Sequence, residues 1–155
     1  MATTYITRTP AGTGNQRTFT MSYWLKRAAQ GVGDNFYSQS GGKCYLEFTS
    51  GDFLNIGMNT SGTSVDAIKT NRVFRDPAAW YNIVLKMDTT QSVAADRMRL
   101  YINGVEEVAA NWSTTNYPAE DADILINTTL QYYIGSQTAS TNYFSGEMSH
   151  VQFVD

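Results

Sequence analysis

The 155-residue chain has one cysteine, one histidine and three prolines. A single cysteine excludes an intrachain disulfide, unlike the usual small secreted scaffold. Cys44 shares a face with Leu46 and Phe48 in the segment KCYLEF, which predicts a buried, unreactive thiol. His150 has no second histidine to complete a zinc site and no cysteine nucleophile near it in sequence. We expect it to be a structural residue.

Charge is also sparse, since only 16% of the residues are charged and the net charge is -3. The eleven Lys and Arg are scattered and form no basic stripe, so nucleic acid is not an expected partner. There is no apolar run of about 18 residues, and no charged and then apolar leader follows Met1. The sequence therefore predicts neither a membrane span nor a cleaved signal peptide.

What the chain does have is aromatic side chains, 13% of its residues, and strands with alternating polarity. Three segments place apolar side chains at every second position, as a half-buried strand does. Asn103-Gly104 follows one of them and predicts a hairpin turn, because both central positions of a type I′ turn need positive φ. The side chains expected in the core are Met21, Tyr23, Leu25, Tyr81, Ile83, Leu85, Met98, Leu100 and Ile102.

About eleven segments read as strands, with turn signals every 8 to 12 residues or so, which predicts an all-β fold, an antiparallel two-sheet β-sandwich in one domain. The segment 109–127 is the least regular. In the last strand, a bulge near Ser149-His150 would put Met148, Val151 and Phe153 on the core face. The predicted strands are Thr3–Thr7, Phe19–Arg27, Asn35–Gln39, Lys43–Thr49, Leu54–Met58, Ser64–Phe74, Trp80–Asp88, Arg97–Ile102, Val105–Val108, Leu130–Gly135 and Tyr143–Val154.

Four segments together resemble the laminin-G-like, concanavalin A-like jelly-roll superfamily, over nearly the whole chain and in the family's order. They are FTMSYWLKR, RDPAAWYNIVLKMDTTQ, RMRLYINGVEE and YYIGSQTASTNYFSGEMSHVQFVD. The likeness is greatest to domains of bacteriophage virion proteins, such as tail fibres and surface proteins. It implies one laminin-G-like domain over residues 1–155, either a whole protein or a piece of a longer chain.

The resemblance implies a non-enzymatic structural or interaction module of a phage virion, a capsid decoration or a fibre component. Its partners would be other virion proteins or further copies of itself. The protein would be assembled in the host cytoplasm and end on the surface of the extracellular particle. The alternative is a lectin-like receptor-binding module that recognises host surface glycans on a concave sheet or its loops.

Catalysis is not expected. Glycanases of the superfamily carry a Glu-x-Asp-x-Glu strand, which this chain lacks. Retaining glycoside hydrolysis needs two carboxyls about 5 to 5.5 Å apart, and the adjacent Glu106 and Glu107 would point to opposite faces of a strand. Two carboxyls across an open groove, for example Glu47 and Glu147, would contradict this expectation.

A metal site has two candidates. Asp121 and Asp123, next to Glu120, could offer oxygen ligands to calcium, although the same segment also reads as a solvated acidic loop. Asp88 and Asp96 are the second candidate. The sequence predicts no other cofactor.

Several aromatic side chains lie in or beside predicted loops, where flat rings can stack on sugars or join protein interfaces. Some of them would simply cap the core. The candidates for contact with a ligand or partner are Trp112, Tyr117, Tyr132, Tyr133 and Tyr143.

Overall fold

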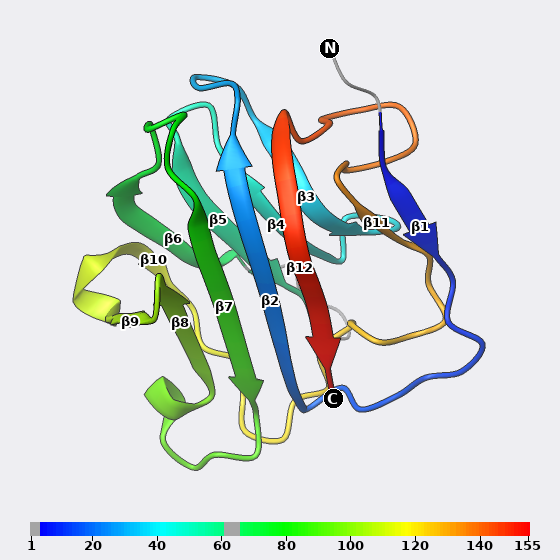
Figure 1. Ribbon diagram of the computed structural model, residues 1–155. Coiled ribbons are helices and arrows are strands. Elements are labelled where there is room, and N and C mark those ends of the chain that lie inside the picture. The colour runs from blue at the N-terminus through cyan, green and yellow to red at the C-terminus, as the bar shows by residue number, and fades with distance from the viewer. Residues whose placement is uncertain (1–3, 61–65) are drawn as a thin grey trace.

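A computed structural model describes residues 4–60 and 66–155 as a two-layer antiparallel β-sandwich (Figure 1). One sheet has seven strands in the order β1-β11-β3-β4-β5-β6-β10, and the other has five in the order β12-β2-β7-β8-β9. This confirms the predicted all-β, two-sheet fold. The strands are β1 (Ile6–Arg8), β2 (Thr18–Arg27), β3 (Asp34–Gln39), β4 (Cys44–Phe48), β5 (Phe53–Met58), β6 (Asp66–Val73), β7 (Tyr81–Asp88), β8 (Met98–Ile102), β9 (Val105–Glu107), β10 (Trp112–Thr115), β11 (Tyr132–Ile134) and β12 (Gly146–Val154).

Helix contributes little: in the described ranges it consists of two 3-10 turns, η1 (Ala94–Asp96) and η2 (Ala109–Asn111). Neither is long and apolar enough to cross a membrane.

The core is filled by the alternating residues of β2, β7 and β8 on one side. Met21, Leu85 and Leu100 lie opposite one another across these three strands, and all three are buried. Of the nine predicted core residues, only Tyr81 stays half-buried; its ring packs edge-on against Phe74, with the ring centroids 5.1 Å apart. The alternation therefore identified the core face of this sheet correctly.

The hairpin turns also have the backbone conformation that the sequence predicts. Asn103 and Gly104 have φ values of 52° and 79°, as the predicted hairpin requires, and the Gly41-Gly42 turn between β3 and β4 also has positive φ at both residues. Cys44 is fully buried, and burial raises the pKa of its thiol to about 12. The predicted inert thiol is confirmed.

Two strand predictions need correction. The segment 109–127 contains a strand, β10, which pairs with β6 at the edge of the seven-stranded sheet. Its sequence, WSTT, buries only one side chain firmly and so has no clear alternation. The first strand is also shorter than predicted: β1 begins at Ile6, and Thr3 lies outside the described residues, as do the first two residues of the predicted Ser64–Phe74 segment.

β12 contains the predicted bulge. His150 has a φ of 49°, and the pairing with β2 shifts by one residue between Ser149 and Gln152. Phe153 consequently lies opposite Met21, on the core face. It is still 40% exposed, because β12 is the last strand of its sheet.

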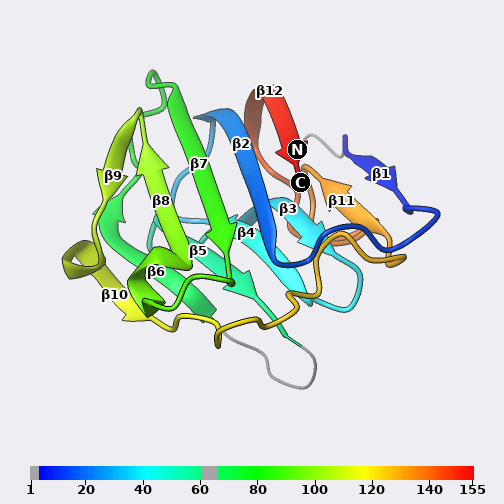
Figure 2. The same cartoon turned by 90° about the horizontal axis from the view of Figure 1, so that it is seen from below.

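The two sheets do not match in width at this edge. β1 and β11 lie beyond β12, on the side away from β2, in both views of the molecule (Figures 1 and 2). Their inner face is therefore not covered by the five-stranded sheet. We call this pair of strands the overhang.

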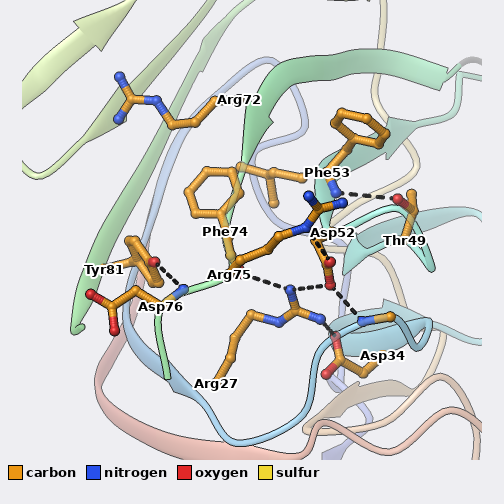
Figure 3. Close-up of polar contacts among 12 residues, drawn as sticks. Arg27, Asp34, Thr49, Asp52, Phe53, Arg72, Phe74, Arg75, Asp76 and Tyr81 are labelled. Atoms are coloured by element: carbon orange, nitrogen blue, oxygen red, sulfur yellow. Dashed lines mark hydrogen bonds and ion pairs between the residues drawn. The ribbon is translucent and has the colours of Figure 1, made fainter. Parts of the chain in front are cut away.

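A buried charge network ties together the end of β2 and the loops after β4 and β6 (Figure 3). The Arg27 side chain is inaccessible to solvent; its Nη1 donates to Asp52 Oδ1 at 3.0 Å and to the Phe74 carbonyl at 2.8 Å, and its guanidinium lies 4.4 Å from the centre of the Phe48 ring. Arg75 also donates to Asp52, at 2.9 Å. These contacts hold the loops that close one end of the sandwich.

Candidate functional site

The overhang and β12 enclose a hollow of about 390 Å³, which we call the edge cavity. Met21 and Tyr23 of β2, Tyr37 of β3 and Ile126 form its buried floor. All four belong to the hydrophobic core, and each is at most 5% exposed. The volume lies within the range of about 300 to 1,000 Å³ that small-molecule sites usually have.

The walls come from the two sheet edges. Arg8 and Tyr132 are directly paired in the β1–β11 ladder, so both project from the same face of the overhang toward the cavity. Phe153 of β12 forms the facing wall, and its ring stacks on Phe19 with the centroids 5.6 Å apart. The Phe19 contact fixes the ring while leaving much of it open to a ligand.

Tyrosine hydroxyls are the unusual feature of the floor. Tyr23 and Tyr37 are only 2% and 5% exposed, yet no hydrogen bond among the described residues engages either hydroxyl, nor that of Tyr132. Burial raises the pKa of both Tyr23 and Tyr37 well above the ordinary value, so both phenols stay neutral and can donate as well as accept. Neither hydroxyl is among the fully buried polar atoms that lack a partner, so both reach the edge cavity, where a ligand or water can engage them.

The rim carries further polar groups, from Asn127, Gln152 and Asp155. The Asn127 side-chain amide donates to Asp155 Oδ2 at 2.5 Å and to the Asn15 carbonyl at 3.2 Å, while the Asn15 backbone N–H also donates to Asp155 Oδ2. The Asp155 carboxylate is thus held in place by its neighbours. The cavity combines an apolar floor, aromatic walls and oriented polar groups at the rim.

A second surface of interest lies on the outer face of the seven-stranded sheet. Asn35, Glu47, Asn55 and Lys69 occupy one register across β3, β4, β5 and β6, and we call them the outer row. Asn55 donates to Glu47 Oε1 at 3.0 Å. The Asn35 amide is buried and has no hydrogen-bond partner in the described part of the chain.

Aromatic rings border the outer row at its β3 edge. The Tyr5 ring lies 6.1 Å from those of both Tyr133 and Tyr143, and Tyr143 forms a backbone bridge with Asn35. The Tyr133 hydroxyl donates to Gln131 Oε1 at 2.9 Å, so this hydroxyl, unlike those of the cavity, already has a partner.

The structure does not bring the five predicted contact residues together. Tyr132 lines the edge cavity, whereas Tyr133 and Tyr143 stand by the outer row. Trp112 and Tyr117 pack on each other near β10, with centroids 6.2 Å apart, and Tyr117 lines a smaller hollow of about 160 Å³. Their contact roles stay predictions.

Sequence reasoning missed most of the cavity. The sequence pattern places Tyr23 and Phe153 only on the core face, and nothing in it singles out Arg8 or Tyr37. No local signal could have found them, because the hollow arises from the difference in width between the two sheets. A tyrosine at a predicted core position was the one available hint, since its hydroxyl needs a partner.

The calcium candidates lie next to a cationic side chain. Arg17 Nε lies 2.7 Å from Asp123 Oδ1, and its Nη1 lies 3.3 Å from Asp121 Oδ1. The described residues include no group of three or more His, Cys, Asp or Glu side chains that could hold a metal. Calcium at Asp121 and Asp123 stays a prediction, and the ion would compete with Arg17. Asp88 of the second candidate accepts hydrogen bonds from Thr90 and Gln91.

The carboxylates singled out as a possible catalytic pair lie on different sheets. Glu47 alternates with the buried Leu46 and Phe48, so it faces outward from the seven-stranded sheet. Glu147 projects from the outer face of the five-stranded sheet, where its carboxylate lies 3.9 Å from Lys26 Nζ. The two side chains therefore do not face one groove.

Solved structures with the same fold come from several organisms. A candidate carbohydrate-binding protein of Bacteroides ovatus is 17% identical, with a TM-score of 0.61 over 96% of this chain and 40% of its own. Domain 4 of the GH43 extracellular arabinanase AbnA of Geobacillus stearothermophilus, in complex with arabinotriose, is 16% identical (TM-score 0.62; 92% of this chain, 62% of that one). The heptameric SAP-like pentraxin of Limulus polyphemus is 16% identical (TM-score 0.59; 96% and 68%).

These identities are low enough that the structural likeness shows the fold alone, and the chain spans 40% and 62% of the length of the first two proteins. A search of curated protein sequences found no match. The sequence profile of the Concanavalin A-like lectin/glucanases superfamily matches residues 1–155. Together with the two-sheet architecture, that match shows that the chain belongs to the concanavalin A-like lectin/glucanase superfamily.

Proposed function

We propose that this protein is a carbohydrate-binding module and that the edge cavity is its sugar site. The observation that carries the proposal is the pair of almost fully buried tyrosines, Tyr23 and Tyr37, which line the cavity and whose hydroxyls have no hydrogen-bond partner among the described residues. Sugars present hydroxyl groups that can both donate to and accept from phenols. Their apolar ring faces suit the aromatic walls that Tyr132 and Phe153 provide.

Two proteins with the same fold support this assignment. The Geobacillus domain is in complex with arabinotriose, and the Bacteroides protein is named as a candidate carbohydrate-binding protein. The fold is thus compatible with sugar recognition. The residues of the edge cavity, rather than the likeness, indicate where this chain would bind.

We propose binding without hydrolysis. A glycoside hydrolase generally needs two carboxyl groups that flank the scissile bond. Among the described residues, Asp155 is the one carboxylate that lines the edge cavity, and Asn127 and Asn15 already hold it. A lone, hydrogen-bonded carboxylate suits recognition of a sugar hydroxyl better than paired acid and base catalysis.

The test is a glycan array followed by titration of the best sugar. Phe153→Ala removes one aromatic wall, so we expect its dissociation constant to rise about tenfold, which corresponds to about 1.4 kcal/mol. The matched control is Tyr133→Ala, which removes an aromatic ring beside the outer row and should leave the affinity unchanged. No binding to any glycan, or loss of binding in Tyr133→Ala and not in Phe153→Ala, would contradict the proposed site.

The resemblance to phage virion domains motivates a second proposal, that the module belongs to a larger particle as a capsid decoration or fibre component. Two surface features favour contact with protein. β12 is a nine-residue strand at the edge of its sheet, and Trp24 is 40% exposed on the outer face of the same sheet. A strand edge that pairs with no other described strand and an exposed tryptophan are features that a partner subunit would cover.

Sedimentation and immunolabelling would test this second proposal. We expect a species larger than the 17.2 kDa chain, and label on phage particles from an infected culture. A monomer at high concentration, together with unlabelled particles, would count against a virion role. This outcome would leave the sugar-binding proposal standing, because the edge cavity is formed within one chain.

A further inference from the structure

We infer that the sugar bound in the edge cavity carries a carboxylate, with Arg8 as the group that recognises it. This inference rests on the proposed function and narrows the ligand from sugars in general to acidic sugars, such as uronic and ulosonic acids.

Arg8 has no acidic partner among the described residues. Every other arginine of the chain forms at least one ion pair within 4.0 Å: these are Arg17, Arg27, Arg72, Arg75, Arg97 and Arg99. Arg8 has neither an ion pair nor a side-chain hydrogen bond in the described residues. In a chain with net charge -3, a guanidinium without a carboxylate is the exception.

Arg8 also lines the edge cavity. Its Cα pairs with that of Tyr132, whose ring packs on buried Tyr37 with the centroids 6.0 Å apart. Tyr132 thus lies on the inner face of the overhang, and Arg8 projects from the same face and lines the edge cavity. A guanidinium at this position presents its forked N–H groups to whatever occupies the cavity, and that geometry matches a carboxylate in two parallel hydrogen bonds.

The rest of the cavity offers neutral hydroxyls and one acidic group. Tyr23 and Tyr37 supply neutral hydroxyls at the floor, with no charge of either sign there. Asp155, the acidic group at the rim, has its Oδ2 engaged by Asn127 and by the Asn15 backbone. A ligand that meets all of these groups has hydroxyls on an otherwise apolar ring and one anionic substituent at the Arg8 side.

Matched pairs of sugars test the inference, by calorimetric titration at low ionic strength. The pairs are 3′-sialyllactose with lactose, and trigalacturonate with its methyl ester. We expect the acidic member of at least one pair to bind about tenfold to a hundredfold more tightly, as charge-assisted hydrogen bonds allow. We also expect the preference to shrink at high salt, because Arg8 is exposed to solvent.

Three variants test whether Arg8 causes the preference for the acidic sugar. Arg8→Gln should abolish the preference for the acidic sugar while keeping the binding of its neutral counterpart, and Arg8→Lys should retain part of it. Lys43→Gln removes the same charge from an exposed site in the β3–β4 turn, away from the cavity, and should change nothing. An undiminished preference in Arg8→Gln would overturn the inference.

The same measurements distinguish a failure of this inference from a failure of the proposed sugar-binding function. If wild-type protein binds acidic and neutral sugars equally, Arg8 is not a carboxylate receptor, and the proposed sugar site still stands. If it binds no sugar of any kind, the proposed function fails and the inference fails with it.

Discussion

Replacing Asp52 with asparagine is expected to lower the free energy of unfolding by about 3 to 5 kcal/mol, the usual cost of breaking a buried ion pair from one side. Asp52 is 3% exposed and accepts from Arg27 Nη1 at 3.0 Å, from the Gly31 N–H at 2.7 Å and from Arg75 Nε at 2.9 Å. The substitution leaves the Arg27 guanidinium fully buried, with its remaining acidic neighbour, Asp34 Oδ1, 3.8 Å away. Asparagine is chosen because Asp52 has a φ of 65°, which asparagine tolerates and alanine does not.

Denaturant unfolding measures the loss, and Arg75→Gln is its control. Arg75 is bonded to the same carboxylate, but its side chain is 62% exposed, so its removal should cost at most about 1 kcal/mol. An Asp52→Asn variant no less stable than Arg75→Gln would show that the buried pair contributes little.

The same network gives the protein a predictable pH dependence. Burial raises the pKa of Asp34 from its ordinary 3.8 to about 7, with Arg27 acting in the opposite direction. Between these values the folded state keeps a proton that the unfolded chain releases, so Asp34 makes the free energy of unfolding fall as pH rises from about 4 to 7. For Asp52, burial works against ionisation, but the hydrogen bonds from Gly31, Arg75 and Arg27 prevail and lower its pKa, so it stays ionised across this window. Asp34→Asn should remove the part of the fall in the free energy of unfolding that Asp34 causes between about pH 4 and 7.

Truncating Leu100 to alanine is also expected to have a large effect. It should lower the free energy of unfolding by about 2 to 5 kcal/mol. Leu100 is inaccessible to solvent at the centre of β8, directly opposite Leu85 of β7. The substitution removes buried apolar surface and leaves a cavity that the rigid ladder on both sides cannot close. Leu85→Ala should cost a similar amount.

Thermal and denaturant unfolding measure the stability of these variants. The control is Val105→Ala, on the neighbouring strand β9. Val105 is 67% exposed, so its truncation should change stability by no more than about 0.5 kcal/mol. Losses below about 0.5 kcal/mol at both Leu85 and Leu100 would mean that these residues do not form the core.

The sequence by itself determined the class of fold and the core face of its central strands. Period-two alternation in β2, β7 and β8 is a local property, because consecutive side chains of a strand must point to opposite faces. Asn103-Gly104 and the bulge at His150 were predictable for the same reason: each depends on backbone conformation within a few residues. β10 escaped prediction because an edge strand with the sequence WSTT is recruited by pairing with β6 and not by its own pattern.

Only the tertiary structure decided where a ligand could bind. The sequence placed Tyr23 and Phe153 on the core face, but it could not show that the core is open beside them. The opening exists because β1 and β11, from opposite ends of the chain, pair with each other and extend the seven-stranded sheet past β12. The same pairing carries Arg8 to the cavity wall, next to Tyr132 and far from it in sequence. Strand order and sheet width are set by pairing between distant segments, and local side-chain periodicity does not encode them.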